Sequence, residues 1–275
     1  MLRFNSSIFI LFILFPLFSL AQAPGIDSIH NKYLSEKNGS LKIKYHLKYI
    51  FMLINTGRLK EAESEMALTR KEMDKSPVAS VVPVLFYYEG TLKYEQADYL
   101  QSIISFERSL KTFLLPGEEK DDYGFTMGNI HISLGLSYSM VNDWENAQLN
   151  YQRAIMENEK AKDSSGTALA YLDMAYIFSD VNDWVNASVN LKRSTNYLNA
   201  NSNKNYDIAI YASLAEAYSR LNMLNESNIY LKKSDSLIHL YPDPSGKTFH
   251  FIAKGENEFS AKNYPGALTA TLSSL

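Results

Sequence analysis

Histidines are the residues of this cysteine-free chain of 275 residues that are best suited to acid–base or metal chemistry. There are five of them: His30, His46, His131, His239 and His250. No two are four residues apart on a helix, so the spacing that a helical zinc site needs is missing. When the repeats described below are aligned, His46 and His131 take a position that is otherwise aromatic, which predicts packing side chains with one polar end. We therefore expect no metal and no cofactor.

The other arrangements that could support catalysis are weaker still. The acidic run Glu118–Asp122 lacks the spaced oxygen ligands and the following Glu of a calcium loop. The chain has no Gly-rich phosphate loop and no Gly-x-Ser-x-Gly nucleophile motif. We expect a solvated loop at the acidic run, no catalytic residues and no enzymatic activity.

The charge balance argues against a nucleic-acid partner. Lys and Arg total 27, Asp and Glu total 30, and the formal net charge is −3. No run of basic residues occurs, whereas a phosphate backbone requires a basic patch or stripe. We expect no nucleic acid among the partners.

The N-terminus has the pattern of a secretory signal peptide. Arg3 precedes the apolar run Ile8–Leu20, and Ser19 and Ala21 are the small residues that a signal peptidase requires. The run is about 13 residues long, short of the roughly 20 that span a bilayer, and no second run of spanning length follows. We expect a signal peptide at 1–21, export to the periplasm or the extracellular space, and no stable membrane span in the mature chain. An uncleaved anchor is the alternative.

The elements that would position any functional residue are helical repeats. The segment Val141–Ala147 (VNDWENA) returns forty residues later as Val181–Ala187 (VNDWVNA). Such an echo at a fixed offset is typical of repeat proteins. Large apolar residues recur at i, i+3, i+4 and i+7, which predicts helices and no strands.

Three positions fix the register of the repeats. An aromatic residue or leucine begins each second helix: Leu59, Tyr99, Trp144, Trp184, Leu224 and Tyr264. A small residue lies three positions after the start of the second helix, as at Ala147 and Ala187. Another small residue lies nine positions before that start, as at Gly90, Gly135 and Gly255. Small residues at these points let two helices approach closely. The tryptophans are expected to be buried anchors.

The corners between paired helices have matching turn residues. Gly57, Asn142, Asn182 and Asn222 fall where the first helix must end, and Gly and Asn tolerate the left-handed conformation of a C-terminal cap. Asp98, Asp143, Asp183 and Asn263 fall where a side-chain oxygen can cap the next helix.

Together, Gly135, Tyr138, Trp144, Ala147, Tyr151 and Ala154 resemble the signature of the tetratricopeptide repeat. The resemblance covers Leu41 to Leu275, with repeats of about 40 residues in place of the usual 34 or so. It implies an all-α fold, a right-handed α-solenoid of about six helical hairpins. Exported arrays with long repeats are similar to the sensor regions of bacterial histidine kinases and helix-turn-helix regulators.

The expected organisation follows from this register. After the signal peptide, a lead at 22–40 contains a short capping helix, and the array fills 41–275. The repeats are expected at about 41–80, 81–122, 123–163, 164–204, 205–246 and 247–275, the last of them incomplete.

The resemblance also implies where a ligand binds, because the first helices of such repeats line the concave face. Carried over position by position, the ligand groove consists of Tyr87, Tyr94, Ile132, Leu136, Met140, Leu172, Tyr176 and Asp180. This apolar, aromatic set suits an amphipathic helix or an extended peptide. The alternative is that the long helices turn these residues into the core.

Two functions therefore remain open. The first is a non-enzymatic exported scaffold that binds a peptide or protein, as the sensor part of a truncated signalling protein. The second is a structural or assembly module. The sixth repeat carries an apolar stripe on its second helix, so self-association through 248–275 is expected for that module.

Overall fold

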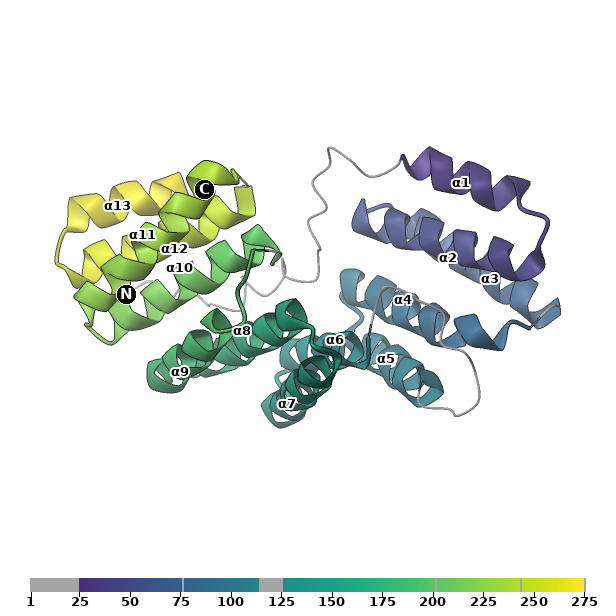
Figure 1. The fold of residues 1–275 in the computed structure, drawn as a ribbon, viewed down its shortest axis with the longest axis horizontal. Coiled ribbons are helices and arrows are strands. Elements are labelled where there is room, and N and C mark those ends of the chain that lie inside the picture. The colour runs from purple at the N-terminus through teal and green to yellow at the C-terminus, as the bar shows by residue number, and fades with distance from the viewer. Residues whose placement is uncertain (1–24, 76, 114–125, 201, 243, 275) are drawn as a thin grey trace. The chain divides into compact units, whose positions relative to one another are not determined.

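The computed structural model describes residues 25–274 apart from 76, 114–125, 201 and 243. The expected signal peptide and the acidic run Glu118–Asp122 lie outside these residues. Every regular element of the described part is a helix, so the predicted all-α fold is confirmed (Figure 1). No helix in the described part is both long and apolar enough to cross a membrane.

The chain divides into two compact units, one up to Asn150 and the other from Tyr151. The first contains α1 (Ile26–Ser35), α2 (Gly39–Asn55), α3 (Leu59–Lys75), a short 3-10 helix (Ala79–Val81), α4 (Val82–Glu95), α5 (Tyr99–Phe113) and α6 (Met127–Met140). The division falls within α7 (Trp144–Ala161). The second contains α8 (Ser164–Asp180), α9 (Trp184–Thr195), α10 (Lys204–Arg220), α11 (Leu224–Leu240), α12 (Pro244–Ser260) and α13 (Tyr264–Ser273).

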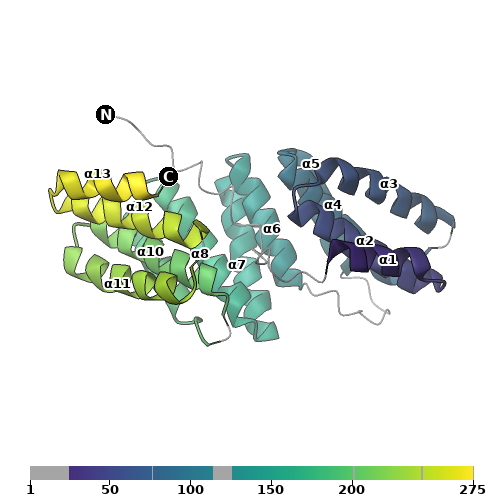
Figure 2. The ribbon, with the colours of Figure 1, turned by 90° about the horizontal axis from the view of Figure 1, so that it is seen from above.

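Within each unit the helices pack as consecutive hairpins. In the N-terminal unit α2 packs on α3 and α4 on α5, and in the C-terminal unit α8 packs on α9, α10 on α11 and α12 on α13. The first helix of the middle hairpin, α10, also contacts both α8 and α12 (Figure 2). Helices α8, α10, α11 and α12 each have 17 residues, so long helices account for much of the forty-residue period.

The corners of the hairpins share one turn geometry. Asn142, Asn182 and Asn222 have φ of 60°, 60° and 59°, and Gly57 has φ of 73°, as the sequence predicts. At the corner that contains Asn142, Asp143 N–H donates to Tyr138 C=O and Asn142 N–H donates to Ser139 C=O, both at 3.0 Å. These two bonds form a Schellman motif, which uses carbonyls that the helix end leaves unpaired.

The same corners begin the second helices. Asp143 Oδ1 accepts from Asn146 N–H at 3.2 Å, and Asp183 Oδ1 accepts from Asn186 N–H at 3.1 Å. Each bond satisfies one of the free N–H groups in the first turn of a helix. Asn at the left-handed position followed by Asp at the cap therefore ends one helix and begins the next.

Close approach between paired helices is clearest at Gly90. A Cβ placed there would lie 2.6 Å from Cδ1 of Phe106, whose ring is completely buried between α4 and α5. The small residues Gly135, Ala147, Ala187 and Gly255 are likewise buried. Trp144 and Trp184 are only partly buried, so the prediction that they are buried anchors is wrong. The first turn of the second helix lies near solvent, so the small residue one turn later is the one packed in the core.

Buried serine hydroxyl groups join α5 to α4 and α9 to α8 through hydrogen bonds. Ser109 Oγ donates to Pro83 C=O and Ser194 Oγ donates to Ala168 C=O, both at 2.7 Å and both buried. Ser109 and Ser194 hold the same position, ten residues after the start of α5 and α9. A small hydroxyl at this position satisfies a carbonyl without holding the helices apart.

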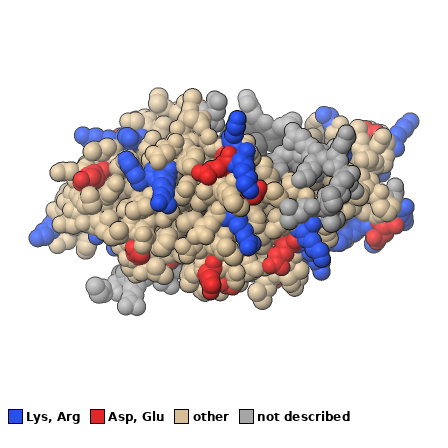
Figure 3. Space-filling model, turned by 60° about the horizontal axis from the view of Figure 1, so that its bottom comes forward, with Lys and Arg blue, Asp and Glu red and all other residues tan. Residues whose placement is uncertain are grey.

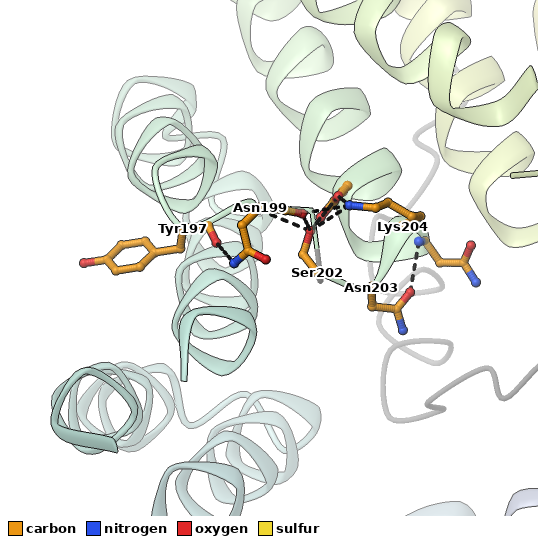
Figure 4. Close-up of polar contacts among 7 residues, drawn as sticks. Tyr197, Asn199, Ser202, Asn203 and Lys204 are labelled. Carbon is orange, nitrogen blue, oxygen red and sulfur yellow. Dashed lines mark hydrogen bonds and ion pairs between the residues drawn. The ribbon is translucent and has the colours of Figure 1, made fainter. Parts of the chain in front are cut away.

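The link between α9 and α10 is fixed by its own polar contacts (Figure 4). Ser202 Oγ donates to the Asp207 carboxylate at 2.7 Å, and Lys204 Nζ donates to the same carboxylate at 2.9 Å. Lys204 Nζ also donates to Asn199 C=O at 2.8 Å. These bonds hold the start of α10 and thereby orient the helix that lies between α8 and α12.

Candidate functional site

The residues of the expected ligand groove divide into two groups. The side chains of Tyr94, Ile132, Leu136 and Leu172 are buried, each at most 5% exposed. They cannot line an open groove, so for these four the groove prediction is wrong and the alternative, that long helices turn them into the core, holds. Tyr87, Met140, Tyr176 and Asp180 are partly exposed.

In the N-terminal unit the partly exposed Tyr87 is already engaged. Its hydroxyl accepts a hydrogen bond from Ser133 Oγ at 3.4 Å, and its ring packs against Phe106 with centroids 5.5 Å apart. Burial raises the pKa of the Tyr87 hydroxyl. Tyr87 is thus a packing residue with a polar end.

In the C-terminal unit, Tyr176 and Asp180 belong to a larger polar surface. Asp173, Tyr176 and Asp180 lie at i, i+3 and i+7 of α8 and so share one side of that helix. Ser213, Glu216 and Arg220 have the same spacing on α10, and Glu256 lies on α12 at the position of Glu216. We call Asp173, Tyr176, Asp180, Glu216, Arg220 and Glu256 the acidic helix face.

Hydrogen bonds and ion pairs join the three helices of this face. Tyr176 on α8 and Ser213 on α10 share a hydrogen bond of 3.2 Å between their hydroxyl oxygens. Arg220 on α10 lies 3.0 Å from the Glu256 carboxylate on α12 and 3.9 Å from Glu216 on its own helix. The guanidinium also lies over the Trp184 ring, 5.2 Å from its centroid. The single arginine of the face is therefore committed to two carboxylates and a ring.

Asp173 is the exceptional member. Its side chain is 2% exposed, and neither carboxylate oxygen has a hydrogen-bond partner. Asp180 Oδ2 is buried and unpaired as well. Buried polar groups are nearly always paired, so unpaired ones mark places where a structure is incomplete or has a function.

Burial sets the electrostatics of the face. It raises the pKa of the Asp173 carboxyl well above its usual range and also raises the pKa of Asp180. Burial raises the pKa of Glu216 to about 7, with Arg220 opposing the rise and Glu256 adding to it. The pKa of Tyr176 is raised chiefly by burial, and Asp173 and Glu216 add to the rise.

Two members of this face, Tyr176 and Asp180, are among the predicted ligand residues, and the other four are not. The predicted ligand positions end in the fourth repeat. The position of Tyr176 is Glu216 in the fifth repeat and Glu256 in the sixth. An acidic residue there twice in succession, where the third repeat has Leu136, was a readable signal. Asp173 had no such signal, because its burial depends on packing.

His46 and His131 are buried and have polar partners. His46 is completely buried, with Nε2 2.7 Å from the Glu65 carboxylate and Nδ1 3.0 Å from Thr69 Oγ1. His131 Nδ1 lies 3.0 Å from Asn150 Oδ1. Both are therefore packing residues with polar partners, as the repeat alignment predicts. Within the described residues, no three His, Asp or Glu side chains are grouped as metal ligands.

Comparison with known proteins identifies the fold through structure alone. No protein-family model matches the chain, and no curated protein matches it. A Signal Transduction ATPase with Numerous Domains (STAND) protein with a tetratricopeptide repeat sensor, from Pyrococcus horikoshii, matches with a TM-score of 0.71 at 13% identity. The match covers 90% of this chain and 38% of that protein. The chain has the tetratricopeptide-repeat fold.

Two Rap structures also resemble this repeat array. The apo form of RapI matches with a TM-score of 0.67 at 12% identity, covering 83% of this chain and 84% of RapI. A Rap protein complexed with Competence and Sporulation Factor matches with a TM-score of 0.64 at 12% identity, covering 90% and 69%. At such low identity, these matches show a shared fold. They do not show that the matched proteins have the side chains of the acidic helix face.

Proposed function

We propose that this repeat array is a non-enzymatic scaffold that binds a peptide or protein partner on the acidic helix face. One observation carries the proposal. Helices α8, α10 and α12 present five residues of this face at equivalent repeat positions. Tyr176, Asp180, Glu216 and Glu256 are partly exposed, and Arg220 is exposed. Rigid helices that hold an aromatic ring among charged groups offer both contact area and orientation to a partner.

The structural relatives support this class of function. One Rap structure has the Competence and Sporulation Factor bound, and the Pyrococcus protein uses its tetratricopeptide repeats as a sensor. Charge favours a protein or peptide over a nucleic acid. On the face drawn in Figure 3, Lys and Arg side chains are interspersed with Asp and Glu across a wide uncharged surface.

Export and signalling belong to the same proposal. The apolar run Ile8–Leu20 supports export, which would place the partner in the periplasm or outside the cell. A sensing role would require only that the bound partner changes the packing of α8, α10 and α12.

Selection from a phage-displayed library of random dodecapeptides tests the proposal. The full chain should enrich peptides that bind it in fluorescence anisotropy. Tyr176→Ala should weaken that binding by about tenfold, because a stacked aromatic contact is lost. The matched control Tyr241→Ala, at a tyrosine 47% exposed beyond α11, should not change it. Failure to enrich any peptide, or equal effects of the two substitutions, would contradict the proposal.

A second candidate function is self-association through 248–275. Tyr264, Leu268 and Leu272 are spaced by four residues on α13 and are 59%, 63% and 61% exposed. They form an apolar stripe that a second copy of the chain could cover.

A further inference from the structure

The second helices α9 and α11 carry the same short pattern of exposed residues. Helix α9 contains VNLKR at 189–193, and α11 contains IYLKK at 229–233, forty residues later. In both, an apolar residue precedes two basic residues by three and four positions, so all three lie on one side of the helix. Val189 and Ile229 are 43% and 53% exposed, and the four basic residues are exposed as well. We call these six residues the basic surface.

Contacts around one tyrosine join the two halves of the basic surface. Lys192 on α9 donates a hydrogen bond from Nζ to the hydroxyl group of Tyr230 on α11. The Lys192 ammonium group lies 5.2 Å from the centroid of the Tyr230 ring, and the Lys233 ammonium group lies 5.0 Å from the same centroid. The basic residues of α9 and α11 are therefore neighbours around a single ring.

That ring is itself held in place. Tyr230 is 7% exposed and stacks on Tyr211 and Tyr218 of α10, with centroids 6.1 Å and 5.8 Å apart. Lys233 also lies over the Tyr211 ring, 5.2 Å from its centroid. Side chains that are already positioned lose less conformational entropy when a ligand binds. Lys192 and Lys233 are thus exposed cations with a fixed support.

The basic surface carries positive charge that the chain does not neutralise. Within the described residues, none of its four basic side chains forms an ion pair with a carboxylate. Helix α9 contains no acidic residue. On α11, Asp235 lies 3.6 Å from His250 Nε2, and Glu226 lies seven residues before Lys233. A positive surface on a chain of net charge −3 favours an acidic partner.

The basic surface is separate from the acidic helix face. Tyr218, which supports it, lies two residues from Glu216 on α10, which is about 200° around a helix of about 3.6 residues per turn. The two surfaces therefore lie on different sides of α10.

The apolar members narrow the class of partner. Carboxylates of a peptide can pair with the basic residues while its apolar side chains cover Val189 and Ile229. A phosphate backbone would pair with the same basic residues and leave both apolar side chains exposed to water. Acidic and apolar residues in alternating groups, as on an amphipathic segment, match the order of residues on α9 and α11.

We infer that α9 and α11 form a second binding surface, whose partner is an acidic amphipathic peptide segment. Its carboxylates pair with the four basic residues, and its apolar side chains cover Val189 and Ile229. This surface does not depend on a ligand at the acidic helix face.

A designed peptide tests the inference. Isothermal titration calorimetry of the full chain uses an acetylated and amidated dodecapeptide of Glu and Leu in helical spacing, and the same peptide with every Glu replaced by Gln. The Glu peptide should bind about tenfold more tightly than the Gln peptide, and its affinity should fall as salt is added. Equal affinities of the two peptides, or no binding of the Glu peptide, would overturn the inference.

Paired substitutions locate the contact. Lys192→Gln with Lys233→Gln, and separately Arg193→Gln with Lys232→Gln, should each weaken binding of the Glu peptide by about tenfold. The control Lys60→Gln with Lys71→Gln removes two exposed charges on α3 and should bind as the parent does.

The second pair is also the folding control. Within the described residues, Arg193 and Lys232 form no hydrogen bond, ion pair or ring contact, so their loss should leave the urea midpoint unchanged. Undiminished binding by either pair, or an equal loss of binding in the control pair, would overturn the inference.

Discussion

Asp173 makes the stability of the fold depend on pH. Its carboxyl group is buried in α8 without a partner, and burial raises its pKa well above the usual range. Between the unfolded pKa of about 3.9 and the folded pKa, the folded state holds a proton that the unfolded state has released. Stability contributed by the neutral form is therefore complete below the unfolded pKa and is lost as the pH rises through the folded pKa.

Asp173→Asn removes this pH dependence. We predict a larger free energy of unfolding for Asp173→Asn than for the parent at about pH 8, because the amide is neutral in both the folded and the unfolded state. The gain should shrink towards about pH 4.5, where the parent carboxyl is neutral in the fold. Urea unfolding at both pH values measures it, with Asp235→Asn as the exposed control. A variant less stable than the parent at pH 8 would show that Asp173 has a stabilising partner.

Gly90 lies against the buried ring of Phe106, which leaves no room for a side chain. Gly90→Ala places a Cβ 2.6 Å from Phe106 Cδ1, so the buried ring or α4 must move. Overpacking of a core costs about 1–3 kcal/mol, which exceeds the gain of up to about 1 kcal/mol in helix propensity. Gly39→Ala is the matched control, because nothing lies within 4 Å of its Cβ. Urea melts that find the two variants equally stable would contradict the close approach of α4 and α5.

At the scale of elements, the corner between α6 and α7 depends on one backbone conformation. Asn142 has φ of 60°, which Gly adopts freely and a β-branched residue resists. We predict that Asn142→Gly is neutral within about 0.5 kcal/mol and that Asn142→Val costs about 1–2 kcal/mol. Thermal melts check both. Equal stability of the Gly and Val variants would mean that the corner has another conformation in solution.

The exposed apolar stripe of α13 leads to a prediction about self-association. Its exposed stripe of Tyr264, Leu268 and Leu272 would be covered in a self-associated form. Light scattering should show concentration-dependent dimers, and Leu268→Glu with Leu272→Glu should abolish them by placing charges in the contact. The same double change at Val185 and Val189, exposed on α9, is the control. A parent chain that stays monomeric at every concentration would contradict the second candidate function.

At the scale of the whole molecule, the sequence predicts the repeat and its corners well, because these depend on local chemistry. Asn142, Asn182 and Asn222 adopt the left-handed conformation that their type favours, and Asp143 and Asp183 cap the helices that follow. Ala97 and Lys262 adopt the same conformation, with φ of 59° and 63°, and their types give no hint of it.

The candidate site was less predictable because burial depends on how each long helix is rotated against its neighbours. Tyr94, Leu136 and Leu172 have the right repeat positions for a groove and are nonetheless buried. Asp173 was overlooked because a single aspartate on a helix is usually solvated. Only packing shows that its carboxylate is enclosed and unpaired.

Amide hydrogen exchange of the full chain with a selected peptide tests the central proposal most directly, because it locates the bound partner without any substitution. Binding on the acidic helix face should slow exchange in α8, α10 and α12 and leave the outer helices α9, α11 and α13 unchanged. Protection confined to α9, α11 or α13, or no protection at saturating peptide, would contradict the account.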